Sequence, residues 1–126
     1  KIINFLFETV GETLWLNKES DINKVTAISG SGPGYVFQFI DAFEKAASKL
    51  GLGEKVNRKL IYQTFFGSIN LLLKENKTAS LLAKNIAIKG GTTEAGLQVF
   101  NNKKILQKTF NKVIKAAYMK ANKLGN

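Results

Sequence analysis

The chain has 126 residues, 44% hydrophobic and 22% charged, a mix typical of one globular domain or of one domain with part of another. It contains no Cys and no His, which excludes thiolate redox chemistry, Cys/His zinc sites, imidazole acid–base catalysis and His-dependent nucleophiles. The sequence has no apolar run of the roughly 18 residues that a membrane span requires. The lack of Cys favours a cytoplasmic protein.

The first twenty residues differ in pattern from the rest. Residues 2–10 are apolar and precede Gly11, which is typical of the end of a helix, and the short bulky run at residues 14–16 is typical of one β-strand. Nothing later in the sequence offers a convincing strand partner, and the chain begins without Met inside an apolar pattern. We therefore expect a piece of a longer protein, with this strand in a sheet whose other strands lie outside the chain.

From Pro33 onward the periodicity becomes helical. Pro33 suits the first turn of a helix, Ser31 or Gly32 can cap it, and Gly51 can end it in a left-handed conformation. The apolar stripe of this helix recurs at spacings of three and four residues, at Val36, Ile40, Phe43, Ala47 and Leu50.

The next helix, predicted over residues 54–74, has almost no polar face. Because small helices of one chain cannot easily enclose such a helix, we expect a second subunit to cover part of it, with Gly67 permitting close backbone approach. The alternative is a central helix in a monomeric bundle.

Three shorter or more polar helices follow. One starts after Thr78, another starts near Thr92 or Thr93 and ends at residues 101–102, and the last spans about residues 103–124 with Gly125 as its terminator. The net charge is +10, and every basic residue except Arg58 is Lys. We favour a solvated face over a nucleic-acid track for the lysines of the last helix, Lys103, Lys104, Lys108, Lys112, Lys115, Lys120 and Lys123.

Two glycine-rich segments, residues 29–34 and residues 90–93, each precede a predicted helix. A helix start presents unpaired N–H groups and a partial positive charge, so a carboxylate or phosphate could bind at either segment. For a single such segment we favour an ordinary turn leading into a helix cap, and the presence of two segments in one small chain makes binding somewhat more favoured. Neither has the Gly-Lys-Ser/Thr of a phosphate-binding loop or follows a plausible strand, so we do not expect nucleotide binding by this chain alone.

Residues 25–35 (VTAISGSGPGY) together with residues 90–97 (GGTTEAGL) resemble the pyrroline-5-carboxylate reductase family, and the similarity extends over nearly the whole chain. The resemblance implies that residues 21–126 are an all-α helical dimerisation and substrate-side domain, forming an intertwined homodimer or a higher oligomer. It implies that residues 1–20 are the remnant of an N-terminal dinucleotide-binding (Rossmann) domain. A fragment of this kind is expected to be inactive alone.

The resemblance also implies an activity: the C=N bond of 1-pyrroline-5-carboxylate is reduced to L-proline with NADPH or NADH, which the missing domain mainly binds. Thr93 would position and polarise the substrate through its hydroxyl. The implied substrate-binding residues are Lys89, Gly90, Gly91, Thr92 and Thr93. The implied active-site or interface lining is Ser29, Gly30, Ser31, Gly32, Pro33 and Asn85. No metal is expected.

One departure from the family pattern is local: Ile88-Lys89 stands where members usually have Ser-Pro. Without the Ser hydroxyl one expected substrate contact is lost, and without the Pro ring the turn is less restrained, so we expect a weaker substrate affinity. Lys89 either supplies a compensating cation or points into solvent. Two other hypotheses remain open, a basic helical nucleic-acid-binding module and a purely structural oligomerisation module. Binding that weakens steeply with salt would favour the former.

Overall fold

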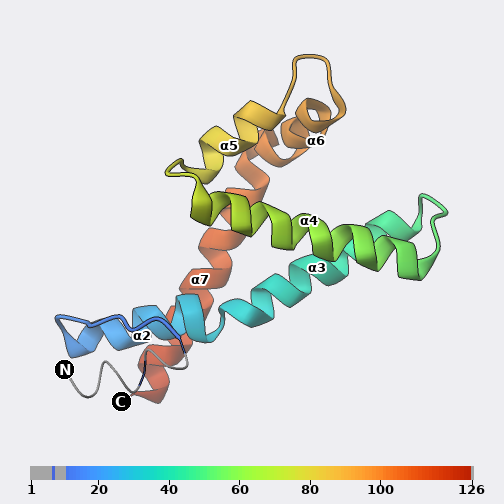
Figure 1. Ribbon diagram of the computed structural model, residues 1–126. Coiled ribbons are helices and arrows are strands. Elements are labelled where there is room, and N and C mark those ends of the chain that lie inside the picture. Colours follow the sequence, from blue (N-terminus) through green and yellow to red (C-terminus); the bar gives the residue numbers. More distant parts are fainter. Residues whose placement is uncertain (1–6, 8–10, 126) are drawn as a thin grey trace.

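The computed structural model describes residue 7 and residues 11–125, and every regular element in that part of the chain is helical (Figure 1). The all-α class predicted from the sequence is therefore confirmed. In chain order the elements are η1 (Glu19–Asp21), α2 (Ile22–Val25), the π-helix η2 (Thr26–Gly30), α3 (Gly32–Ser48), α4 (Glu54–Lys74), α5 (Ala79–Ile86), α6 (Thr92–Asn101), η3 (Asn102–Lys104) and α7 (Ile105–Leu124).

Local signals fix the ends of the central helices as predicted. Gly51 takes a left-handed conformation (φ +80°) just after α3, which a side chain with a Cβ adopts only at a cost. Helix α4 spans the predicted residues, Glu54–Lys74. The Thr78 hydroxyl oxygen accepts a hydrogen bond from the Leu81 backbone N–H at 3.3 Å and so caps α5.

The last helix starts slightly later than predicted. Lys103 and Lys104 have φ angles of +50° and +54°, which interrupt the helical path between α6 and α7. Helix α7 therefore begins at Ile105, and it ends at Leu124 next to the predicted terminator Gly125. Gly125 itself is right-handed (φ −91°), so it ends the helix without a left-handed cap.

The first glycine-rich segment is helical, which corrects the expectation of a turn with open N–H groups. Residues 26–30 form the π-helix η2, which continues α2 and leads into α3. The Ser31 N–H donates to the Thr26 carbonyl oxygen at 2.9 Å, and the Gly34 N–H donates to the Ser31 carbonyl oxygen at 3.1 Å. Ser31 occupies the cap position of α3 but its side chain makes no capping hydrogen bond. Two backbone donors on which an anion would depend here, those of Ser31 and Gly34, are thus already used.

Residues 12–16, which include the predicted strand, have no regular secondary structure. A strand requires a hydrogen-bonded partner, and none of the described residues supplies one. That residues 14–16 form a strand in a sheet whose other strands lie outside this chain therefore stays a prediction. The predicted helix end at residues 2–10 lies outside the described residues except for Phe7, which is helical.

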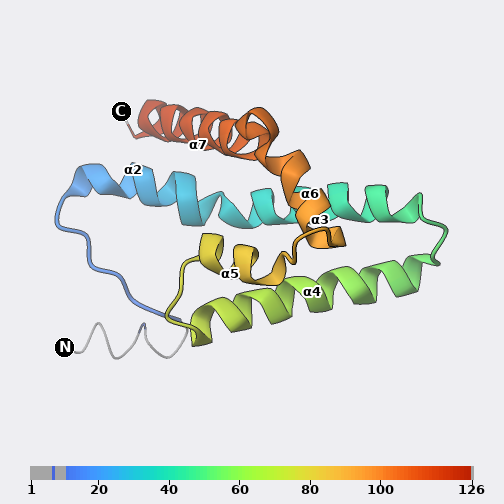
Figure 2. The ribbon, with the colours of Figure 1, turned by 90° about the horizontal axis from the view of Figure 1, so that it is seen from above.

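The helices form two antiparallel pairs instead of one closed bundle. Helices α3 and α4 run side by side as a hairpin, and α7 packs along α2 and η2 (Figures 1 and 2). Helices α5 and α6 connect the end of α4 to α7 (Figure 1). Between α2 and α7, the Asn23 side-chain amide donates to the Asn122 side-chain oxygen at 2.9 Å.

This arrangement leaves the chain with almost no core of its own. Among the described residues only Ala27, Asn57 and Ile61 are buried. The accessible surface is 11029 Å², against about 6,700 Å² for a compact monomer of this mass. Helix α4 carries several large apolar side chains in solvent, among them Leu60, Phe66, Ile69 and Leu73. The alternative of a central helix enclosed in a monomeric bundle is therefore wrong.

Two features hold the α3–α4 hairpin together. The Phe65 ring makes edge-to-face contacts with Phe39 and Phe43, at centroid distances of 6.0 and 6.3 Å. Arg58 of α4 approaches Glu44 of α3 at 3.7 Å, and it is also paired with Glu54 within α4 at 2.9 Å. Hydrogen bonding to the Glu44 carboxylate, with some desolvation, raises the pKa of Tyr62 above its ordinary value.

No described helix combines the length and the apolar character needed to cross a bilayer. Nor do the described residues bring three metal-ligating side chains together.

Candidate functional site

The second glycine-rich segment forms a true turn, between α5 and α6. The Gly91 N–H donates to the Ile88 carbonyl oxygen at 2.9 Å, and Gly90 has a left-handed φ of +76°. A positive φ at the third position is the mark of a type II turn, where Gly is favoured. A Cβ on Gly91 would lie 3.0 Å from the Ile88 oxygen, so both glycines are required by the local geometry.

A carboxylate from α6 closes this turn on its other side. Glu94 is the third residue of α6, and its Oε2 accepts a hydrogen bond from the Gly90 N–H at 2.8 Å. A carboxylate in the first turn also interacts favourably with the helix dipole. Glu94 is not among the site residues predicted from the sequence, although an acidic residue three positions after a cap residue is the usual signal for this contact.

The first turn of α6 nevertheless keeps free donors. Among the described residues, the backbone N–H groups of Thr92, Thr93 and Glu94 have no hydrogen-bond partner, and the Ala95 N–H is the first to bond, to the Gly91 oxygen at 3.2 Å. Three adjacent N–H groups at the positive end of a helix form a geometry suited to a carboxylate. The Thr93 side chain is half-buried beside them, whereas that of Thr92 is exposed.

The predicted substrate residues are thus contiguous in one turn, with Asn85 exposed in the last turn of α5. Lys89 is exposed at the second position of the turn and makes no ion pair with a described residue. The first glycine-rich segment lies elsewhere, at the junction of η2 and α3, far from the α5–α6 turn in Figure 1. One chain by itself does not bring the two segments into one site.

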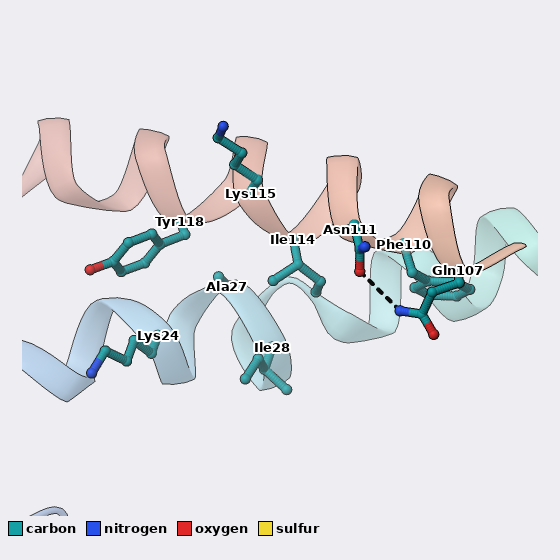
Figure 3. A pocket seen from close by; sticks show the side chains of 9 residues that line it. All are labelled: Lys24, Ala27, Ile28, Gln107, Phe110, Asn111, Ile114, Lys115 and Tyr118. Carbon is teal, nitrogen blue, oxygen red and sulfur yellow. Dashed lines mark hydrogen bonds between the residues drawn. The ribbon is translucent and has the colours of Figure 1, made fainter. Parts of the chain in front are cut away.

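A hollow of about 610 Å³ lies between α2, η2 and α7 and contains none of the predicted site residues (Figure 3). Ile114 and Tyr118 of α7 line it opposite Ala27, and the Gln107 side-chain amide donates to the Asn111 side-chain oxygen at 2.9 Å. Lys24 at its edge is held by Asp21 at 2.6 Å, and that hydrogen bond raises the pKa of Lys24. The hollow therefore has an apolar centre, with the cations Lys24 and Lys115 among its lining residues.

The turn and the open helical hairpin point to the same protein family. Residues 19–124 match the family model described as pyrroline-5-carboxylate reductase dimerisation. The chain belongs to this family. The predicted resemblance is therefore confirmed by a match that includes both glycine-rich segments.

Curated relatives agree with the family assignment. The chain is 45% identical over 97 residues to pyrroline-5-carboxylate reductase 2 of Bacillus subtilis, covering 77% of this chain and 34% of the relative. It is 40% identical over 97 residues to the pyrroline-5-carboxylate reductase of Haemophilus influenzae, covering 76% and 36%. The chain thus spans about a third of the length of these pyrroline-5-carboxylate reductases.

Solved structures show the same fold. A pyrroline carboxylate reductase from Plasmodium falciparum, solved with NADP bound, matches with a TM-score of 0.90 and 33% identity over 99% of this chain and 47% of that one. A pyrroline-5-carboxylate reductase from Coxiella burnetii matches with a TM-score of 0.91 and 32% identity, covering 98% and 45%. The open arrangement of helices is therefore that of the matched part of these reductases.

Proposed function

We propose that the chain is the dimerising, substrate-side part of an oxidoreductase that reduces the C=N bond of 1-pyrroline-5-carboxylate to L-proline, the last step of proline biosynthesis. The observation that carries the proposal is the family match over residues 19–124, joined to a turn whose free N–H groups suit the carboxylate of that substrate. Residues 21–126 would form the helical domain, and residues 1–20 the end of a dinucleotide-binding domain. The absence of Cys favours the cytoplasm for this enzyme.

The partner that covers the exposed helices would be a second copy of the chain, in a homodimer or a higher oligomer. The accessible surface exceeds that of a compact monomer by about 4,000 Å², and obligate interfaces remove 2,000 Å² or more in total. The Cβ position of Gly67 has open space around it, which leaves room for a close helix on that face of α4. A shared interface would also supply the contacts that one chain lacks between residues 29–33 and the turn.

In the proposed site the substrate carboxylate accepts hydrogen bonds from the free N–H groups at the start of α6. The Thr93 hydroxyl then positions the ring nitrogen or carboxylate, while Lys89 supplies a nearby cation. A protonated imine already accepts hydride, so the task of these residues is orientation and not proton transfer. Ser29, Gly30, Ser31, Gly32, Pro33 and Asn85 would line the site or the interface.

The described residues do not fit a dinucleotide. Residues 29–34 lie in η2, in α3 or at their junction, and the Ser31 and Gly34 N–H groups are already bonded. No described strand precedes either glycine-rich segment. NADPH or NADH would therefore be bound mainly by a part of the enzyme outside these residues.

A fusion protein tests the proposal. The chain replaces the matching segment of the Plasmodium falciparum relative, which was solved with NADP bound, and the rest of that enzyme is kept. NADPH oxidation is then followed with and without the imine. We expect imine-dependent oxidation with proline as product. A folded, oligomeric fusion that oxidises NADPH no faster with the imine than without it contradicts the proposal.

A further inference from the structure

The α5–α6 turn has little to hold it apart from two hydrogen bonds. One is the bond from the Gly91 N–H to the Ile88 oxygen, and the other is the bond from the Gly90 N–H to the Glu94 carboxylate at 2.8 Å. The side chains of Ile88 and Lys89 are exposed, so packing within the chain restrains the turn little. Lys89 occupies the second turn position, where a proline would fix φ but a lysine leaves it free.

We infer that Glu94 is a positioning residue of the proposed substrate site, because its carboxylate ties the left-handed Gly90 to α6 and so fixes the direction of the free N–H groups of Thr92 and Thr93. The inference rests on the proposed function for its substrate, a small cyclic imine carboxylate. Glu94 acts on the turn and its side chain need not touch the substrate.

A second consequence of this contact concerns where an anion can bind. If the Gly90 N–H were free, it would compete as a donor for a carboxylate. The Gly91 N–H already donates to the Ile88 carbonyl oxygen. With both glycine donors occupied, the N–H groups of the first three residues of α6 remain without a partner among the described residues. Glu94 therefore removes Gly90 as a donor that could compete with α6 for an incoming carboxylate.

The hydrogen bond can be separated from the charge by two substitutions. Glu94→Gln keeps a side-chain oxygen that can accept from Gly90, whereas Glu94→Ala removes the acceptor. In the active fusion protein we expect Glu94→Ala to raise KM for the imine about tenfold, with kcat within about twofold, since the N–H groups bind the substrate in ground and transition states alike. KM for NADPH stays unchanged.

Glu94→Gln is expected to keep KM for the imine within about threefold of the parent value, or to lower it. The substitution retains the hydrogen-bond acceptor and removes a negative charge that has the same sign as the substrate carboxylate. Glu54→Ala is the matched control, since Glu54 also lies in the first turn of a helix but far from the turn in sequence, on α4. Equal effects of the Gln and Ala substitutions, or an unchanged KM in Glu94→Ala, would overturn the inference.

A measurement on the chain itself keeps this test independent of the reductase. Amide hydrogen exchange followed by NMR is expected to show Gly90 and Gly91 exchanging about tenfold faster in Glu94→Ala than in the parent chain. Adding Lys89→Pro to that variant should restore the protection of Gly91, because the ring restrains the same turn. Unchanged exchange in Glu94→Ala refutes the contact whatever the activity, whereas an inactive parent fusion refutes only the proposed function.

Discussion

Residues 29–34 and residues 88–93 both combine glycine with small polar residues ahead of a helix, yet only the second segment forms an open turn. In the first, η2 continues α2, and the Ser31 N–H bonds back to Thr26. Side chains add to this: the Thr26 hydroxyl donates to the Ile22 oxygen at 2.9 Å, and the Tyr35 hydroxyl donates to the Ala27 oxygen at 3.3 Å. In the second, α5 ends at Ile86 before the glycines are reached.

The difference shows that glycine content alone does not make an anion site. What distinguishes the second segment is a glycine with a positive φ, at Gly90, and a new helix whose first three N–H groups have no partner among the described residues. The glycines of the first segment all have negative φ, a conformation that other residues also adopt, so the conformational freedom of glycine is not needed there. The comparison therefore predicts opposite responses to the same substitutions in the two segments.

The largest expected effect is that of Gly90→Val. A β-branched residue at φ +76° is strained by roughly 2 kcal/mol, so the turn has to adopt another conformation. We expect kcat/KM of the fusion reductase to fall about 100-fold, with the oligomer intact by light scattering. The control is Gly34→Val in α3, where a Cβ meets open space. A fully active Gly90→Val variant would mean that the turn geometry does not matter.

A smaller effect is expected from Thr93→Val, which removes the hydroxyl and preserves the shape. The expected increase in KM for the imine is about tenfold. Thr26→Val in η2, just before the first segment, is the matched control, because the Thr26 hydroxyl donates to the Ile22 carbonyl oxygen within the same helical stretch. If the two substitutions change KM equally, Thr93 has no special role in the site.

Alanine at the two glycines should change stability in opposite directions. A Cβ on Gly30 meets Thr26 only at ordinary contact distance, 3.7 Å, so Gly30→Ala is expected to stabilise the chain by about 0.5–1 kcal/mol in urea unfolding at fixed protein concentration. Gly90→Ala is expected to destabilise it by about 1 kcal/mol. If both variants change the free energy of unfolding in the same direction, the conformational difference between the two segments is contradicted.

The smallest predicted effect is that of Lys89→Met. Because Lys89 is exposed, its attraction for a substrate carboxylate is weakened by solvent and salt. We expect KM for the imine to rise about threefold at low ionic strength and to match the parent value at high salt. A KM that is independent of Lys89 at low salt would place this side chain in solvent without a role.

Much of the fold follows from local sequence signals. Helix α4 and the termination of α3 at Gly51 were predicted, since apolar periodicity and a left-handed glycine are local properties. The helix over residues 22–30 was missed. Val25, Thr26 and Gly30 are poor helix formers, but Ala27 is buried where η2 packs on α7, and such tertiary contacts override propensity.

The site was predictable only in part. Residues 89–93 were singled out by their motif, and they do lie in one turn at a helix start. The Gly90–Glu94 contact was not predicted, because the family resemblance implies substrate contacts only for residues 89–93. In the proposed homodimer, the relation of residues 29–33 to this turn depends on the partner subunit, which a single sequence does not place.

We propose that the exposed helices are covered by a second copy of the chain. The most direct test is the mass of the purified chain by size-exclusion chromatography with light scattering across a range of concentrations. We expect twice the chain mass of 13.9 kDa, or a larger even multiple, with a melting temperature that rises with protein concentration. A folded species of 13.9 kDa with concentration-independent melting would contradict it.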